Sequence, residues 1–218
     1  MASSMIGVLH DKLIFSRRAR VLSNWFACFA PRHVRILDVG CGNGQIDSIL
    51  QTMRPDLSVR GLDVLLRRGT HISVEIYDGL RIPFDDGSFD WVLFSDVLHH
   101  TENAKMLLRE ARRVASQGVL IKDHYRKGFA SVARLRCMDW VGNRHCGVGL
   151  PYNFWSGKQW RAAWKEIGLK PERLVSRLGL YPVPVDWIFG ARLHFVARLT
   201  KCVPSPLPAI LTSKHAST

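Results

Sequence analysis

Three glycines separated by single residues follow a short apolar run near the start of the chain. The segment reads Ile36-Leu-Asp38-Val-Gly40-Cys-Gly42-Asn-Gly44. Glycines at alternate positions allow a tight backbone turn and the close approach of a ligand, because no Cβ is in the way. Residue 45 is glutamine, so the spacing misses the G-x-G-x-x-G pattern of dinucleotide-binding proteins. No G-K-[ST] follows either, which excludes a P-loop.

Two acidic residues near this turn indicate what kind of ligand it would hold. Asp38 lies two residues before the first glycine, where its charge would repel a phosphate but suits an amino group. Asp63 ends the next apolar run, where a carboxylate can accept hydrogen bonds from both hydroxyls of a ribose. The residues therefore predict a ligand with a ribose and an amino or cationic group, and without phosphates.

Alternating strands and helices are predicted to position these residues. The apolar runs predict strands over residues 34–39, 57–62, 72–77, 89–95, 118–122, 174–180 and 193–200. Helices are predicted over residues 44–53 and 102–114, and from a capping box at Ser156–Gln159 through Ile167. Such alternation is typical of an α/β fold, with a parallel sheet and helices on both of its faces.

Length and composition predict one domain with a sizeable core, since the chain has 218 residues of which 47% are hydrophobic. Residues 11–30 are predicted to form an amphipathic helix, and this N-terminal segment (1–30) is expected to pack on the domain of residues 31–202. A transit peptide or a membrane-surface helix is an alternative. Residues 203–218 are expected to be a frayed tail. The most apolar long stretch carries several charged residues, so no membrane span is predicted.

The five cysteines contain no C-x-x-C pair, which excludes a disulfide framework and the common structural zinc sites. No metal is therefore expected. The odd number of cysteines and the lack of a visible secretory signal favour a cytoplasmic protein.

Four segments resemble a known family in their order and spacing. They read ILDVGCGNG (36–44), GLDV (61–64), YDGLRIPFDDGSFDWVLFSDVLHH (77–100) and LLREARRVASQGVLIKD (107–123). This series is similar to the class I S-adenosylmethionine-dependent methyltransferases, and most of all to a small-molecule, type 11-like branch. The resemblance implies S-adenosyl-L-methionine as cofactor. It also implies a Rossmann-like, doubly wound sheet of seven mostly parallel strands, the last of them antiparallel.

The resemblance assigns the cofactor to residues at the ends of four predicted strands. The methionine part would contact the glycine turn and the end of the fourth strand, at Asp38, Gly40, Gly42, Gly44 and Ser95. The nucleoside part would contact residues that follow the second and third strands: Asp63 at the ribose hydroxyls, Val64 against the adenine, and Asp78 and Gly79 at the adenine amino edge.

The resemblance also implies a direct in-line methyl transfer, in which the protein mainly aligns the acceptor atom with the methyl carbon. A hydroxyl acceptor, slightly favoured here, must lose a proton, and histidine is the usual base near neutral pH. His99 and His100 follow the fourth strand and His124 ends the fifth. Each is either the base or a loop-stabilising residue. His124 is preferred narrowly, because Asp123 and Tyr125 flank it.

The acceptor is expected to be a small or lipid-like molecule. The fourth strand is not followed by the [DNS]-P-P-[YFW] segment of enzymes that methylate amino groups of nucleobases. Residues 126–156 are expected to insert a substrate pocket or lid. Aromatic residues around it would be Trp140, Phe154, Trp155, Trp160, Trp164 and Trp187, and an anionic group could bind Arg126, Lys127, Arg134 or Arg136.

The positive charge lies in the second half of the chain. Residues 1–104 hold 11 basic and 12 acidic residues, whereas residues 105–218 hold 20 and 6. This asymmetry indicates an anionic partner, such as a polyanion, a membrane periphery or a charged substrate, unless the charges form solvated helix faces. Two alternatives stay open at this point: a nucleic-acid methyltransferase, and a catalytically silent cofactor-binding assembly or regulatory protein.

Overall fold

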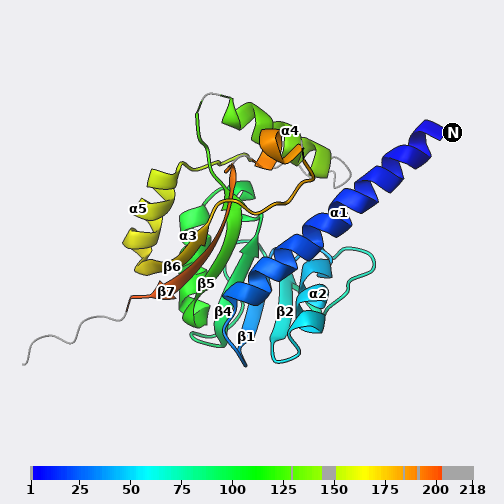
Figure 1. Ribbon diagram of the computed structural model, residues 1–218. Coiled ribbons are helices and arrows are strands. Elements are labelled where there is room, and N and C mark those ends of the chain that lie inside the picture. Colours follow the sequence, from blue (N-terminus) through cyan, green and yellow to red (C-terminus); the bar gives the residue numbers. More distant parts are fainter. Residues whose placement is uncertain (1, 129, 144–150, 184, 191, 203–218) are drawn as a thin grey trace, which may run out of the picture.

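Seven strands of the described residues form one sheet, in the order β3-β2-β1-β4-β5-β7-β6 (Figure 1). The computed structural model describes residues 2–128, 130–143, 151–183, 185–190 and 192–202, and within 2–15 and 139–143 it describes the backbone. The strands are β1 (Arg35–Val39), β2 (Ser58–Asp63), β3 (Val74–Ile76), β4 (Phe89–Ser95), β5 (Ala115–His124), β6 (Leu169–Val175) and β7 (His194–Lys201).

The strand directions confirm the predicted doubly wound sheet. Strands β1 to β5 pair in parallel, and β7 runs antiparallel to both β5 and β6. The chain winds outward from β1 to β3 and then returns to β4 on the other side of β1. Ligands bind at such a reversal of strand order, outside the carboxyl ends of the strands.

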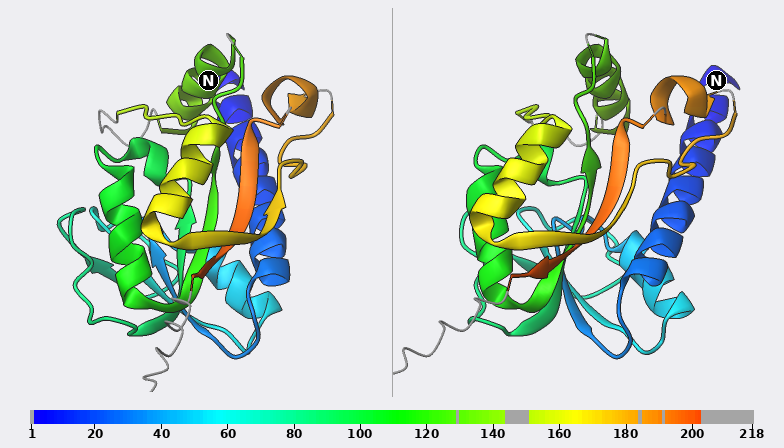
Figure 2. Two further views of the ribbon diagram at one scale, coloured as in Figure 1. Left: turned by 90° about the vertical axis from the view of Figure 1, so that its left-hand side faces the viewer. Right: turned by 60° about the vertical axis from the view of Figure 1, so that its left-hand side comes forward.

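Helices cover both faces of this sheet (Figure 2). Helices α3 (Ala104–Val114) and α5 (Gly157–Ile167) lie on one face, and α1 (Ala2–Phe29) and α2 (Gln45–Met53) on the other. Helix α4 (Ser131–Asn143), the 3-10 turn η1 (Leu98–His100) and the π-helical turn η2 (Asp186–Gly190) stand at the carboxyl ends of the central strands (Figure 1).

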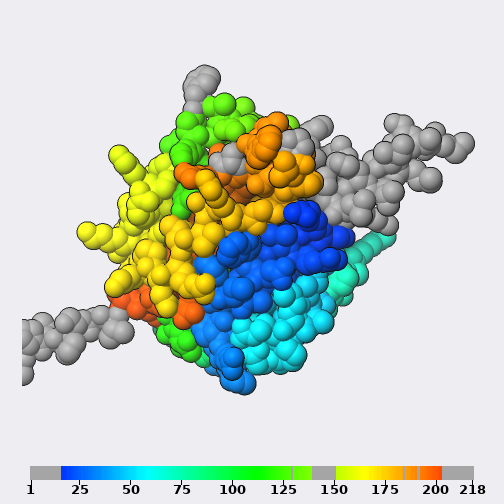
Figure 3. All heavy atoms as spheres, viewed as in Figure 1, coloured from blue at the N-terminus to red at the C-terminus, as the bar shows by residue number. Residues whose placement is uncertain are grey.

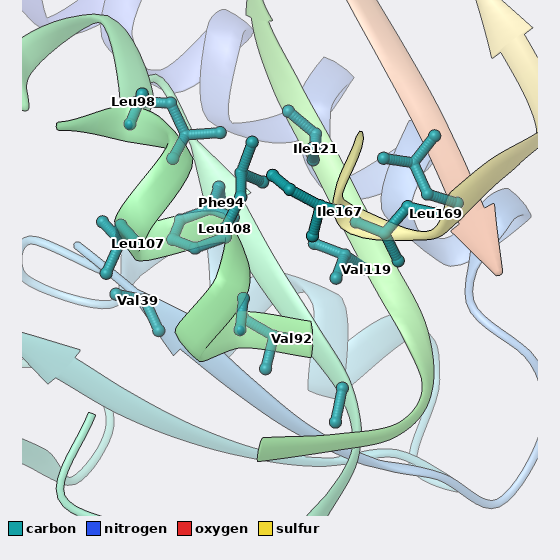
Figure 4. Close-up of a cluster of buried hydrophobic side chains, with 14 of the residues drawn as sticks. Val39, Val92, Phe94, Leu98, Leu107, Leu108, Val119, Ile121, Ile167 and Leu169 are labelled. Atoms are coloured by element: carbon teal, nitrogen blue, oxygen red, sulfur yellow. The ribbon is translucent and has the colours of Figure 1, made fainter. Parts of the chain in front are cut away.

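The larger apolar core lies beneath α3 and α5 (Figure 4). Helix α3 contributes Leu107, Leu108 and Ala111, which form one apolar stripe of a 3.6-residue period. Asn103 fixes the start of the helix, since its side chain accepts a hydrogen bond from the Met106 N–H. The strands beneath contribute buried side chains that include Val39, Val92, Phe94, Val119 and Ile121.

Helix α1 packs on the opposite face through Leu22, Phe26 and Phe29, which are fully buried. The Ser23 hydroxyl donates a hydrogen bond to the Ile46 carbonyl of α2, and this joins the two helices. The helix is longer than the sequence pattern predicts, because its backbone is helical from residue 2. No described helix is long and apolar enough to cross a membrane.

One predicted strand is wrong. The chain forms β6 over residues 169–175 and not over 174–180. Gly168, with φ 74°, ends α5 and turns the chain directly into the sheet. Pro171 lies within β6, which is tolerated because β6 is an edge strand. The apolar Leu178 and Leu180, which suggested a strand, instead pack in the core beside α1.

Candidate functional site

The three glycines of the turn after β1 differ in which neighbouring atoms a side chain at each position would meet. All have positive φ, at 80°, 63° and 72° for Gly40, Gly42 and Gly44. A Cβ on Gly40 would lie 2.4 Å from Val97 Cγ2, and one on Gly44 would lie 2.3 Å from Ile72 Cγ1. A Cβ on Gly42 would meet only the Arg67 side chain, at 3.7 Å. The turn is therefore open at Gly42, where a ligand can approach the backbone.

Asp63 is held at the end of β2 by backbone hydrogen bonds to both of its carboxylate oxygens. Oδ2 accepts from the Gly42 N–H at 2.8 Å, and Oδ1 accepts from the Leu65 N–H at 3.0 Å. The carboxylate thus lies beside the glycine turn with a fixed orientation. Each oxygen has a second lone pair, so Asp63 can also accept hydrogen bonds from the two hydroxyls of a ribose.

The residues predicted to contact the adenine lie together. A Cβ on Gly79 would be 3.1 Å from Val64 Cγ1, so these two positions are neighbours. Val64 is 59% exposed, which leaves its methyl groups available to a flat ring. The Asp78 side chain accepts hydrogen bonds from the N–H groups of Leu80 and Arg81. Those bonds hold its pKa below the ordinary value and keep it ionised.

A second acid, Asp47, lies against Asp38 beneath the turn. Both side chains are buried, and neither carboxyl oxygen of Asp47 has a hydrogen-bond partner among the described residues. Burial raises the pKa of both, to about 6 for Asp47 and well above its ordinary value for Asp38, where the charge of Asp47 adds to the effect. Asp47 was not predicted as a site residue from the sequence, although it occupies the first turn of the helix that follows the glycines.

Asp47→Asn is expected to gain stability relative to the wild type as the pH rises. An acid with a raised folded pKa keeps its proton in the native state, so its contribution to the free energy of unfolding falls above about pH 4. Asparagine has nearly the same shape as aspartate and does not titrate. Urea unfolding should show the difference between variant and wild type growing by about 1–3 kcal/mol from pH 5 to pH 8. A difference as flat as that of Asp85→Asn, an exposed control, would contradict the raised pKa of Asp47.

Two buried polar atoms at the ends of β1 and β4 lack protein partners within the described residues. They are Asp38 Oδ1 and Ser95 Oγ. Unpaired buried polar groups are costly, so such atoms are explained by a ligand or water that completes them. An amino acid moiety, with its ammonium and carboxylate groups, has the chemistry to do so. Both atoms thus fit the methionine part of the predicted cofactor.

Asp123, the second-last residue of strand β5, contacts two of the three predicted base candidates. Its Oδ1 lies 2.7 Å from His99 Nδ1, and it also accepts the N–H groups of Leu98 and His124. Burial opposes the charge of Asp123, but the two histidines hold its pKa well below the ordinary value. An ionised carboxylate only accepts, so Nδ1 of His99 carries the proton and Nε2 is the basic nitrogen.

The surroundings of His124 make its imidazole a weaker base than that of His99. It is buried, and burial together with the charge of Lys122 lowers its pKa well below the ordinary value. Its Nδ1 lies 3.4 Å from His99 Nδ1, and its ring stands 4.7 Å from that of His194. The His100 ring lies at 3.8 Å from the His99 ring, between centroids. The structure thus brings all three predicted histidines together.

A buried ion network lies directly beneath these histidines. Asp96, whose backbone has φ 61°, accepts hydrogen bonds from Lys122 of β5 and Arg18 of α1. Lys122 is fully buried. Asp96, His99 and His124 have donor atoms within 4.8 Å of one another, a spacing that a metal ion could bridge. Because two cations already neutralise Asp96, a divalent ion there would be repelled by Lys122.

The aromatic residues expected around the acceptor lie in different environments. Trp160 and Trp164 were expected in the pocket, which is wrong: they are buried in the core because they lie on the stripe of α5 that faces the sheet. Phe154 stacks on His99 and closes over the histidines. Trp187 is 72% exposed. The side chain of Trp140 and residues 144–150 lie outside the described residues.

The basic residues expected to bind an anionic group are mostly engaged elsewhere. Arg134 donates to the Ile188 carbonyl at 3.0 Å, Arg136 lies over the Tyr152 ring, and Arg126 donates to Gln159. These contacts link α4 and α5 to their neighbours.

Comparisons with known proteins agree with this geometry. Residues 37–121 match a methyltransferase domain family. The chain is 29% identical over 97 residues to 27-O-demethylrifamycin SV methyltransferase of Amycolatopsis mediterranei, covering 38% of this chain and 35% of the relative. It is 30% identical over 104 residues to ajmaline N-methyltransferase of Rauvolfia serpentina, covering 42% and 35%. The matched region thus spans about a third of these curated relatives.

The fold extends the likeness beyond the matched region. A Haloferax volcanii methyltransferase, solved in complex with the Trm112 activator, superimposes with a TM-score of 0.65 over 91% of this chain and 95% of its own, at 17% identity. That identity shows the fold alone. The family match, however, contains the glycine turn, Asp63 and every other residue predicted to bind the cofactor. Residues 37–121 therefore form a methyltransferase domain of the class I S-adenosylmethionine-dependent family, whose cofactor is S-adenosyl-L-methionine.

Proposed function

We propose that this protein transfers the methyl group of S-adenosylmethionine to a small-molecule acceptor. The observation that carries the proposal is the Asp63 carboxylate, fixed on the Gly42 N–H beside the open part of the glycine turn. Asp63 would bind the ribose, Val64, Asp78 and Gly79 would bind the adenine, and Asp38 and Ser95 the methionine end. The cofactor supplies a methyl group that is already activated, so the protein needs only to align the acceptor and manage its proton.

An oxygen acceptor agrees best with the histidine cluster. A hydroxyl must lose its proton as the bond to the methyl carbon forms, and His99 is paired with Asp123 in the way that supports a base. Asp123 would orient the ring and stabilise its protonated form. The names of the curated relatives include both an O- and an N-methyltransferase, so the family match alone favours neither atom. His99 is our choice over His124, because the low pKa of His124 makes it a weak base.

Asp63→Ala is expected to weaken cofactor binding roughly tenfold to a hundredfold. The variant leaves the ribose hydroxyls without their acceptor, and unpaired polar groups cost about 1–3 kcal/mol. Titration calorimetry with S-adenosylhomocysteine measures the change, and thermal unfolding checks that the fold is kept. The exposed Asp85→Ala is the matched control. Equal affinity of wild type and Asp63→Ala would remove Asp63 from the cofactor site.

Transfer of a labelled methyl group tests the function itself. The protein is incubated with methyl-labelled S-adenosylmethionine and, in separate reactions, a small-molecule extract of the source cells, their RNA, or no acceptor. We expect label in the low-mass products alone. Label in RNA would favour the nucleic-acid alternative. Tight cofactor binding without transfer to any fraction would favour a catalytically silent binding protein.

A further inference from the structure

An open pocket of about 550 Å³ lies in the connection between β6 and β7. Its lining residues are Arg177, Asp186, Trp187, Gly190 and Arg192, and its volume falls in the range of small-molecule sites. We propose that this pocket binds an anionic group, phosphate or carboxylate, that is attached to a flat apolar group. We further infer, resting on the proposed function, that this amphiphilic anion is the part of the methyl acceptor remote from the methylated atom.

The charge of the pocket favours an anion. Arg177 and Arg192 are both exposed and form no ion pair with any described carboxylate. Asp186 is the one acid of the lining, and its Oδ1 accepts the Tyr181 N–H at 3.3 Å. The lining thus contains two guanidinium groups and one carboxylate, which leaves an excess of positive charge. The planar guanidinium matches phosphate and carboxylate in geometry, and it binds them through charge-assisted hydrogen bonds.

The apolar surface beside the arginines favours a ligand with a flat apolar part. Trp187 is 72% exposed, and it belongs to a run of exposed apolar side chains in the same connection: Val183, Val185 and Ile188. Contiguous exposed apolar residues rimmed by charges mark binding surfaces. Trp187 offers a ring on which a flat group can stack next to the anion-binding arginines. Figure 3 shows this connection, in yellow-orange to orange, at the surface beside α1.

The backbone that forms the pocket wall is strained at Arg192 and is held in place by hydrogen bonds from neighbouring side chains. Arg192 has φ 60°, a region that glycine and asparagine occupy more readily, and such strain concentrates at ligand sites. Gly190 allows the Asp186 side chain to fold over it, since a Cβ there would lie 2.1 Å from Asp186 Oδ1. The wall is anchored on two sides, because Arg134 donates to the Ile188 carbonyl and His194 bonds to that of Phe189.

The start of β7 connects the pocket to the histidine cluster. Arg192 lies two residues before His194, which pairs with His124 across β5 and β7. The rings of these two histidines are 4.7 Å apart. In Figure 1, η2 is the orange helical turn beside α4, which it contacts. We therefore infer that a molecule anchored in the pocket extends along the start of β7 toward the histidine cluster.

Phenyl phosphate is the probe that combines both chemical features, and inorganic phosphate and phenol each carry one. Binding to the full chain, saturated with S-adenosylhomocysteine, is measured by calorimetry or by NMR of the probe. We expect phenyl phosphate to bind more tightly than either control. Arg177→Gln and Arg192→Gly should each raise its Kd about tenfold or more. Glycine at residue 192 suits the positive φ, so this variant removes the guanidinium without disturbing the wall.

Two further variants make the result specific. Trp187→Ala should abolish the preference for phenyl phosphate over inorganic phosphate, whereas Arg161→Gln, on the exposed side of α5, should leave all affinities unchanged. Equal losses in Arg161→Gln and the pocket variants would overturn the inference, because the binding would then follow net charge. Binding to vesicles that contain phosphatidylglycerol, without binding of phenyl phosphate, would also overturn it in favour of a lipid surface.

Binding of S-adenosylhomocysteine and binding of phenyl phosphate test the proposed function and the pocket separately. S-adenosylhomocysteine should bind the wild type and all pocket variants with the same affinity. If the wild type binds S-adenosylhomocysteine but not phenyl phosphate, the pocket inference is overturned and the cofactor site stands. If it binds phenyl phosphate but not S-adenosylhomocysteine, the anion pocket stands, and its role in methyl transfer is overturned with the proposed function.

Discussion

Asp96→Asn is expected to lower the free energy of unfolding by about 3–5 kcal/mol, because it leaves the ammonium group of Lys122 buried without its anion. Lys122 is fully buried, and Asp96 binds it together with Arg18. Asparagine tolerates the left-handed backbone of residue 96, so the variant removes charge without adding strain. Since domains have a total stability of about 5–15 kcal/mol, urea unfolding followed by tryptophan fluorescence should show a large loss.

The double variant Asp96→Asn/Lys122→Met is the matched control, because it removes both charges and keeps the volume of the lysine stem. It should recover most of the lost stability. In the single variant the pKa of Lys122 falls further below its unfolded value, so the native state binds fewer protons than the unfolded state. Stability then rises with pH, and the loss should be smaller at pH 9 than at pH 7. A loss under about 1 kcal/mol that is independent of pH would show that Lys122 does not depend on Asp96.

Local patterns were sufficient to predict most of the sheet. Strand β4 was predicted over the residues that it occupies, because a buried parallel strand is a continuous apolar run between polar turns. The start of α5 follows from a capping box that the structure contains. The edge strand β6 was misplaced, since its exposed face carries polar residues and a proline, and the neighbouring apolar run packs on α1 instead.

The cofactor site was predictable for the same local reason. The glycines of the turn and the acid at the end of the next strand lie at fixed positions of one strand-turn-helix unit. The ion network beneath the histidines was not predictable. Asp96 is separated by 78 residues from Arg18 and by 26 from Lys122, and such pairs leave no periodic signal in a single sequence. Arg177 and Arg192 were missed likewise, since only the connection between β6 and β7 brings them together.

His99→Ala is expected to lower turnover by about 10²–10⁴-fold with a hydroxyl acceptor, while the affinity for S-adenosylhomocysteine stays unchanged. The imidazole would take the acceptor proton through Nε2, because Nδ1 donates to Asp123 at 2.7 Å. His99 is buried beneath Phe154, so loss of the ring also leaves a cavity. His99→Gln keeps more of the side-chain volume, and thermal unfolding of both variants separates a folding defect from a chemical one.

Comparison with three other variants decides whether a base operates at all. Asp123→Asn should lower turnover as well, since it removes the charge that stabilises the protonated ring of His99. His124→Ala and His100→Ala should have smaller effects, because His124 has a pKa well below the ordinary value and the Asp123 carboxylate lies against the ring of His99. A turnover in His124→Ala that is lower than in His99→Ala would make His124 the base. Equal turnover in the wild type and all histidine variants would mean that alignment of the acceptor with the methyl carbon carries the reaction, and that the histidines stabilise the site.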